Sequence, residues 1–201
     1  LRRSLSRSRS VYAATGSSVP VASGRLSFTL GLHGPCVSFE TACSSSLTAA
    51  HYASQSLKLN ECAAALFAGV TLILLPDVSV SFALAGFTSL RGRCHTFDVR
   101  ADGYLRSEAC CSALLELAEP GIAGDHPALL GSSIQQDGRS ASLTAPNGKA
   151  QEALIRASLA SSAMEPHDAS FAEAHGTGTA LGDPVEVRAL SASLSRRVAG
   201  F

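Results

Sequence analysis

Cys43 occupies a position where a thiol could act as a nucleophile. The preceding residues 36–39 are apolar and include a β-branched valine, which predicts a buried strand. Small or apolar residues then recur at helical spacing, at Leu47, Ala50, Ser54 and Leu57. We therefore expect Cys43 at a strand-to-helix junction, where the free N–H groups of a first helical turn favour a thiolate. The common alternative for a free thiol is an ordinary buried cysteine.

His175 is the second group that could do chemistry. It lies in the run EAHGTGT at residues 173–179, after apolar residues 169–174 that predict a short buried strand. In open α/β sheets, ligands bind beyond the carboxyl ends of the strands, where this imidazole would lie. Its function there would be proton transfer or hydrogen-bond donation near neutral pH. The alternative is a core histidine with satisfied hydrogen bonds.

The residues that follow His175 alternate between glycine and threonine. Gly176 and Gly178 permit close backbone approach or a positive φ, and Thr177 and Thr179 offer hydroxyls. Such a loop could also bind phosphate, but no lysine follows it at the spacing of a Walker motif.

A helix start follows at residues 183–186. Asp183 is expected to cap the helix, Pro184 to occupy its first position, and Glu186 to complete a capping box. We expect this helix to continue to about Arg197.

The rest of the chain alternates between predicted strands and helices. Strands are expected at residues 63–70, 109–117 and 128–135, a helix at 149–164, a helix and loop at 76–89, and a helix end or short strand at 25–30. This alternation predicts an α/β fold with a largely parallel sheet buried on both faces.

Composition excludes several classes of protein. Of the 201 residues, 46% are hydrophobic, which is ample for a core. Basic and acidic residues number 16 each, so net charge gives no argument for binding nucleic acid or an anionic membrane. The six cysteines form no Cys-x-x-Cys pair, which argues against a zinc site. The longest apolar run, residues 62–75, is shorter than the roughly 20 residues that span a bilayer.

The first ten residues differ from the rest because they are mostly Ser and Arg, with no acid. We expect residues 1–10 to form a disordered arm and residues 11–201 to form the folded part. A cytoplasmic location is expected, or a plastid if the arm is the remnant of a transit peptide.

Several motifs in order resemble the β-ketoacyl synthase domain of modular type I polyketide synthases. The two motifs already described carry most of the resemblance: TACSSSL at residues 41–47 and EAHGTGTALGDPVE at 173–186. The chain between them agrees at GRC (92–94), FD (97–98), ADGY (101–104), QDGRS (136–140) and LTAPNG (143–148).

The resemblance implies a fold, a reaction and roles for five residues. The fold would be thiolase-like, an α/β/α/β/α sandwich, and usually dimeric. Cys43 would take an acyl group from the phosphopantetheine of an acyl carrier protein, and a malonyl-type extender would then condense with it after losing carbon dioxide. His175 would donate a hydrogen bond to the extender's carbonyl, and Thr177 and Thr179 would line the pantetheine arm. Glu186 would support a catalytic lysine, and no bound cofactor or metal is expected.

One family motif does not occur in residues 1–201. Lys-x-Asn-x-Gly-His, which supplies that lysine and a second histidine, follows the helix that begins near Asp183 in the family. We therefore expect an incomplete domain, with the end of the N-terminal half and the start of the C-terminal half, that cannot condense alone. The alternative is a degenerate ketosynthase that acts as an interaction module. A thiolase would use coenzyme A instead, and no feature supports a cysteine hydrolase.

Overall fold

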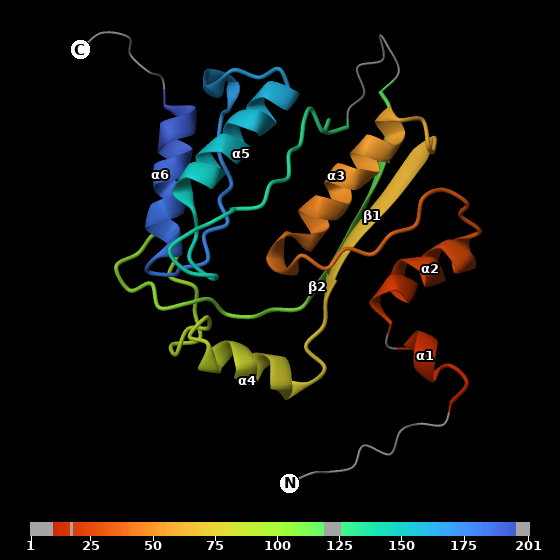
Figure 1. Ribbon diagram of the computed structural model, residues 1–201, viewed down its shortest axis with the longest axis horizontal. Coiled ribbons are helices and arrows are strands. Elements are labelled where there is room, and N and C mark those ends of the chain that lie inside the picture. The colour runs from red at the N-terminus through yellow and green to blue at the C-terminus, as the bar shows by residue number, and fades with distance from the viewer. Residues whose placement is uncertain (1–9, 17, 119–125, 196–201) are drawn as a thin grey trace. The chain divides into compact units, whose positions relative to one another are not determined.

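The computed structural model of the chain describes residues 10–16, 18–118 and 126–195 (Figure 1). Its elements, in order, are α1 (Ala13–Gly16), α2 (Val19–Leu30), η1 (Ala42–Ser44), α3 (Ser45–Lys58), β1 (Ala64–Thr71), α4 (Pro76–Leu84), β2 (Ala109–Glu116), α5 (Gly148–Ser161), η2 (Pro166–Asp168) and α6 (Gly182–Leu194), where η denotes a 3-10 helix. None of the helices within these ranges is both long and apolar enough to cross a membrane.

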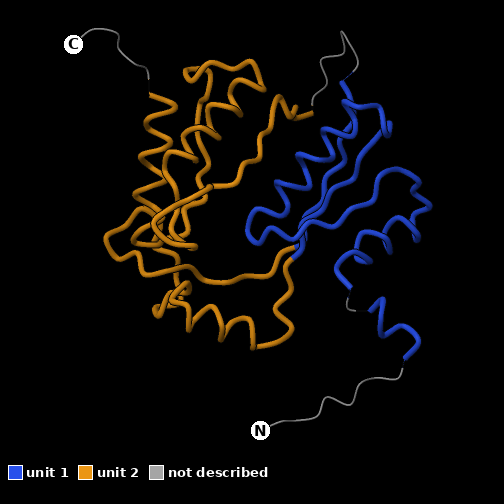
Figure 2. Tube along the Cα trace, in the orientation of Figure 1, with its two compact units in different colours: residues 1–70, 110–122 blue, residues 71–109, 123–201 orange. Residues whose placement is uncertain are grey.

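The chain divides into two compact units, coloured separately in Figure 2. Unit 1 comprises residues 1–70 and 110–122, and unit 2 comprises residues 71–109 and 123–201.

Unit 1 contains the hydrogen-bonded strands β1 and β2, with α3 against β1. The close approach of α3 depends on Gly69, because a Cβ atom there would lie 2.7 Å from the Cβ of Ser46. The segment 25–30, for which the sequence allowed a helix end or a short strand, is the end of α2. Gly31 terminates that helix with φ 67° and donates its N–H to the Ser27 carbonyl.

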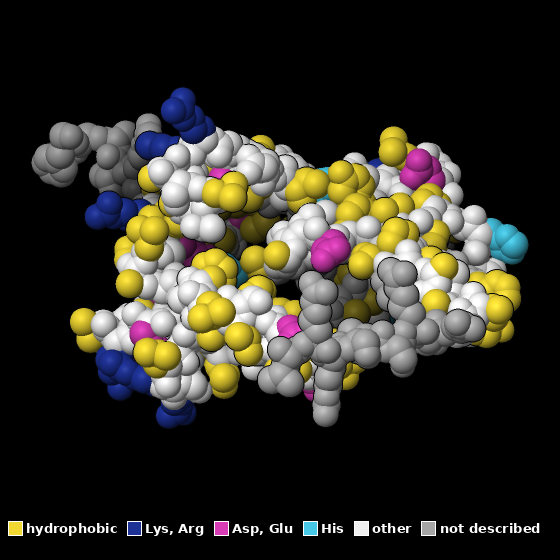
Figure 3. Space-filling view, turned by 60° about the horizontal axis from the view of Figure 1, so that its bottom comes forward, with side chains coloured by type: hydrophobic (Ala, Val, Ile, Leu, Met, Phe, Trp, Pro, Cys, Tyr) yellow, Lys and Arg dark blue, Asp and Glu magenta, His cyan; other side chains and the backbone are white. Residues whose placement is uncertain are grey.

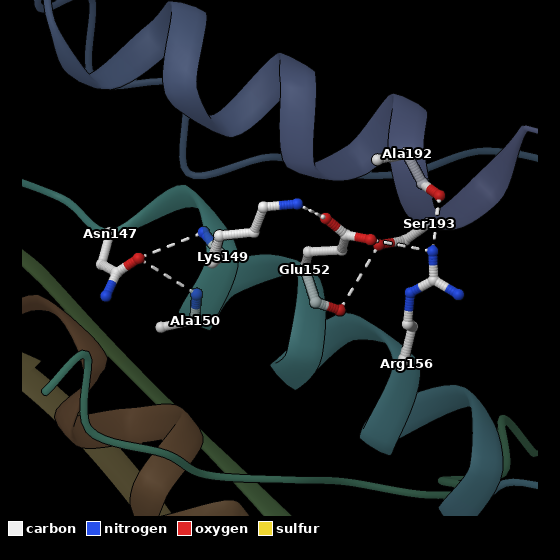
Figure 4. A network of polar contacts seen from close by, with 7 residues as sticks. All are labelled: Asn147, Lys149, Ala150, Glu152, Arg156, Ala192 and Ser193. Carbon is white, nitrogen blue, oxygen red and sulfur yellow. Dashed lines mark hydrogen bonds and ion pairs between the residues drawn. The ribbon is translucent and has the colours of Figure 1, made fainter.

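Unit 2 is organised around the pair α5 and α6. Asn147 caps α5, because its side-chain oxygen accepts hydrogen bonds from the backbone N–H groups of Lys149 and Ala150, at 3.1 and 3.3 Å (Figure 4). Its amide group also donates to the carbonyl of Asp137 at 2.8 Å. The cap therefore ties the start of α5 to the preceding loop.

Polar contacts also join α5 to α6 (Figure 4). The Glu152 carboxylate accepts a hydrogen bond from Arg156 at 2.9 Å and lies 3.5 Å from the Lys149 ammonium, and both interactions lower its pKa. Arg156 also donates to the carbonyl of Ala192 on α6 at 3.0 Å. Ser193 donates to the Glu152 carbonyl at 3.4 Å. The two helices are thus connected through both side chains and backbone.

The expected sheet buried on both faces is wrong. Along β1, half-buried and exposed residues alternate, and in β2 only Leu115 is not exposed. Figure 3 shows apolar side chains on the surface in view. The physical reason is that an apolar run is buried only when a layer of structure covers each face, and α3 is the helix that the described residues place against β1.

Three predicted strands, at residues 36–39, 128–135 and 169–174, are also wrong. The structure assigns no strand to any of them. A strand requires a hydrogen-bonded neighbour, and within the described residues the sheet contains only β1 and β2. An apolar pattern in the sequence cannot show whether such a neighbour exists.

The predicted helices and the other two strands are confirmed, with small shifts at their ends. The helix expected at 149–164 is α5, α4 is the helix of the helix and loop expected at 76–89, and strands 63–70 and 109–117 are β1 and β2. α6 ends at Leu194, and Arg197 lies outside the described residues, as do residues 1–9 of the arm expected at residues 1–10. On α3, Leu47 is 73% exposed, whereas the next residue, Thr48, is buried.

Gly69→Ala is expected to destabilise the protein by about 1–3 kcal/mol, the usual cost of overpacking, because the new methyl group collides with Ser46. Urea unfolding measures the change. The double variant Gly69→Ala/Ser46→Gly removes the opposing Cβ and should recover part of the loss. Equal stabilities of the single and double variants would contradict the contact.

Asn147→Ala is expected to cost about 1 kcal/mol of stability through loss of the helix cap. Asn147→Ser keeps a capping oxygen and is the matched control, which should lose less. Thermal unfolding of both variants tests this, and the cap would be unimportant if they unfolded together with the parent protein.

Candidate active site

Cys43 is the middle residue of η1, two residues before Ser45, the first residue of α3, and its side chain is exposed. The helix that the sequence predicted after it is confirmed, whereas the residues before it form no strand. Ala42 has φ 54°, in the left-handed region that a residue with a Cβ adopts only at a cost. The chain therefore makes a strained turn immediately before the thiol.

Hydroxyl groups around Cys43 hold this turn. Ser45 donates to the Ala42 carbonyl at 2.8 Å and accepts from the backbone N–H of Thr41 at 2.8 Å. Ser44 donates to the Thr41 carbonyl at 2.9 Å, and the hydroxyls of Thr41 and Thr48 are 3.2 Å apart. The serines that follow Cys43 thus bond to the backbone, which explains why polar residues begin this helix.

His175 is exposed and lies on an irregular segment of unit 2. Glu186 holds its backbone: the carboxylate accepts the N–H of His175 at 2.5 Å and the N–H of Gly176 at 2.9 Å. The capping-box prediction for Glu186 is therefore wrong, because its oxygens bind the loop instead of the start of α6. A carboxylate one turn into a helix can turn back to a neighbouring loop, and spacing alone does not distinguish the two arrangements.

Asp183 serves the same loop. Its carboxylate accepts backbone N–H groups from Gly178 at 3.0 Å, Thr179 at 3.3 Å and Phe97 at 2.7 Å, and the residue is only 4% exposed. The prediction that Asp183 caps α6 is wrong, because the residue at the cap position is Leu181. Pro184 consequently lies third in the helix, not first.

The two glycines of the loop adopt the positive φ that the sequence allowed, 54° at Gly176 and 73° at Gly178. A Cβ on Gly178 would lie 3.0 Å from the backbone nitrogen of His95. The carbonyls of both glycines accept hydrogen bonds, from the Thr96 hydroxyl to Gly176 and from the Gly103 N–H to Gly178 at 2.9 Å. The predicted close backbone approach is therefore confirmed, and residues 95–103 make it.

Thr177 and Thr179 are half-buried, and their hydroxyl oxygens are 3.4 Å apart. Thr179 also accepts the N–H of Gly182, the first residue of α6, at 3.1 Å. Its hydroxyl thus has a structural contact in addition to any contact with a substrate.

Four of the five predicted site residues share one loop and the start of one helix in unit 2, namely His175, Thr177, Thr179 and Glu186. Cys43 belongs to unit 1, so its meeting with His175 on one substrate remains a prediction. Within the residues that the structure describes, no group of three His, Cys, Asp or Glu side chains is arranged to hold a metal ion.

Two features of this region are missing from the sequence-based prediction. The first is that residues 95–97 lie beside the His175 loop. The second is that the Asp183 carboxylate joins this segment to the loop. The glycines at 176 and 178 were the available signal, because a glycine that permits close approach implies a segment that approaches.

Two family models match the chain. Residues 2–120 match "Beta-ketoacyl synthase, N-terminal domain" and residues 126–199 match "Beta-ketoacyl synthase, C-terminal domain". Together these ranges cover most of the sequence.

Individual proteins give the same result. The chain is 44% identical over 189 residues to a phenolphthiocerol/phthiocerol polyketide synthase of Mycobacterium tuberculosis. This match covers 92% of the chain and 9% of that protein. It is 45% identical over 192 residues to "Polyketide synthase GfsA" of Streptomyces halstedii, covering 94% of the chain and 3% of that protein. These organisms are bacteria, and their proteins give no support to a plastid location.

Among solved structures, the chain is similar to the ketosynthase from module 6 of the bacillaene synthase of Bacillus subtilis 168. The TM-score is 0.84 at 37% identity, and the match covers 91% of this chain and 34% of that one. The α/β, thiolase-like fold class is thereby confirmed for the part of the domain that the chain represents. The family models and the similarities to polyketide synthases agree, and the chain belongs to the β-ketoacyl synthase family.

Proposed function

We propose that the chain forms part of a ketosynthase active site that condenses an acyl group with a malonyl-type extender in polyketide or fatty acid synthesis. The observation that carries this proposal is the family match through both ketosynthase models, with Cys43 and His175 inside the motifs. Exposure of both side chains supports it, because each must meet a substrate.

Cys43 performs the first step. Its thiolate attacks the carbonyl carbon of an acyl thioester, and the pantetheine sulfur of the acyl carrier protein leaves as a thiolate, which takes up a proton. The acyl group is now held as a thioester on Cys43, so one difficult transfer becomes two easier ones. The strained turn at Ala42 and the surrounding hydroxyls fix the backbone that carries the thiol.

His175 acts in the second step. A malonyl-type thioester loses carbon dioxide, and negative charge develops on its carbonyl oxygen. A hydrogen bond from His175 stabilises this charge. The resulting carbanion attacks the acyl carbon on Cys43, the C–S bond breaks, and a β-ketoacyl thioester forms. Thr177 and Thr179 line the pantetheine arm in this proposal, and Glu186 supports the site.

The proposed enzyme class is acyltransferase. An acyl carrier protein is the proposed partner, a homodimer the proposed assembly and the cytoplasm the proposed location. The chain spans 34% of the bacillaene ketosynthase, so activity is to be measured in the intact natural protein that contains it. The comparisons do not favour the alternative of a degenerate ketosynthase acting as an interaction module.

Cys43→Ala is expected to abolish acyl transfer from an acyl carrier protein thioester, measured as the mass added to the peptide that contains residue 43. Cys36→Ala is a stringent control. Cys36 is exposed in the same unit, and hydrogen bonds with Ser23 and Ser27 lower the pKa of its thiol. If general thiol reactivity explained the label, Cys36 would carry it. Acylation that persists without Cys43 would refute the proposed first step.

His175→Ala is expected to leave acylation of Cys43 intact and to slow condensation about 10²- to 10³-fold, the usual effect of removing one aimed donor. His167→Ala, at an exposed histidine of the same unit, is the matched control and should leave both steps unchanged. Single-turnover assays with labelled acyl and malonyl-type thioesters separate the steps. Unaltered condensation in His175→Ala would remove this residue from the mechanism.

A further inference from the structure

We propose that Asp183 is a positioning residue, which fixes the His175 loop by tying it to residues 95–98. This inference rests on the proposed function, because it assigns the held loop to the condensation step. The support comes from the geometry of one buried carboxylate and the segments that meet at it.

Three backbone donors converge on Asp183 from two separate segments. One carboxylate oxygen accepts Gly178 at 3.0 Å and Thr179 at 3.3 Å, and the other accepts Phe97 at 2.7 Å. Hydrogen bonds to an ionised acceptor are stronger than neutral ones, and a buried carboxylate is costly unless it is so satisfied. The carboxylate therefore joins two loops that are about eighty residues apart along the chain.

The partner segment is itself held in an unfavourable conformation. Phe97 has φ 56°, a value that costs energy for a residue with a side chain. Such a conformation persists only where the surroundings fix it, and the bond from its N–H to Asp183 is one such constraint. The Thr96 hydroxyl bonds to the Gly176 carbonyl beside it. Residues 96 and 97 are thus fastened to the loop at two adjacent points.

The first two turns of α6 hold the His175 loop along its length. Glu186 accepts the N–H groups of His175 and Gly176, and Asp183 accepts those of Gly178 and Thr179. Four of the five amides from residue 175 to residue 179 are therefore directed at two carboxylates one turn apart on a helix. Backbone held this way has little freedom, so the base of the His175 side chain is fixed relative to α6.

Asp183 acts through this loop and not on the substrate. At 4% exposure its side chain is enclosed, and its oxygens already accept three N–H groups. Asp183→Asn keeps the size of the side chain but replaces one oxygen by an NH₂ group, which cannot accept a backbone N–H. At least one of the two loops then loses its acceptor, and His175 shifts.

The test uses the intact natural protein. Asp183→Asn should lower kcat for condensation about tenfold or more, because small misplacements of a catalytic group are costly, with little change in the KM for the extender thioester. Acylation of Cys43 should be unchanged. Asp77→Asn is the matched control, since Asp77 is an exposed acid in the first turn of α4, and it should leave both steps unaltered.

Hydrogen-exchange mass spectrometry gives a readout that does not depend on activity. Peptides that cover residues 95–98 and 176–180 should exchange faster in Asp183→Asn, whereas peptides from α5 should keep the rates of the parent protein. Unchanged exchange in both loops would overturn the proposal. Faster exchange throughout, together with loss of Cys43 acylation, would also overturn it, because Asp183 would then be needed only for folding.

Thr96→Val keeps the test decisive if Asp183→Asn does not fold. Thr96 is exposed, and the change removes only the hydroxyl that bonds to Gly176. It should accelerate exchange in the same two peptides and lower condensation selectively, to a smaller extent; no effect on either readout would overturn the link between the loops. If the parent protein itself fails to condense, the proposed function is wrong, and exchange alone decides whether the loops are joined.

Discussion

Backbone amides that point at buried or half-buried carboxylates are the interaction on which unit 2 depends. Asp183 and Glu186 lie in the first turns of α6 and accept the N–H groups of a loop that forms no strand or helix of its own. A loop without regular structure must satisfy its amides elsewhere, and two carboxylates provide five such contacts when Phe97 is included. The helix in turn is fixed by its packing against α5, so order in the loop derives from a helix pair.

Unit 1 solves a similar problem with hydroxyls. The turn at Ala42 is strained, and the serines that follow Cys43 bond back to the two residues before it. Hydroxyls suit this position because one group can both donate to a carbonyl and accept a backbone N–H, as that of Ser45 does. Gly69 lets Ser46, in the first turn of α3, approach β1 closely, because a side chain at residue 69 would collide with it.

The sequence predicted helices better than strands. α3, α4 and α5 were expected within a few residues, because a helix satisfies its own hydrogen bonds and leaves a local pattern. Residues 36–39, 128–135 and 169–174 have apolar patterns typical of strands but no strand is assigned to them, because pairing depends on a neighbour elsewhere in the fold. Burial shows the same limit, since Leu47 of the apolar helical pattern is exposed and the neighbouring Thr48 is buried.

The sequence alone determined the family and allowed the positive φ at Gly176 and Gly178, because these depend on residue type and order. Tertiary structure decided which groups the carboxylates of Asp183 and Glu186 bind. Both were expected to serve their own helix, which is where local spacing directs them, and both bind a loop instead. A carboxylate binds whichever donors the fold brings within about 3 Å, and the approach of Phe97 from a distant part of the chain is not encoded in any local pattern.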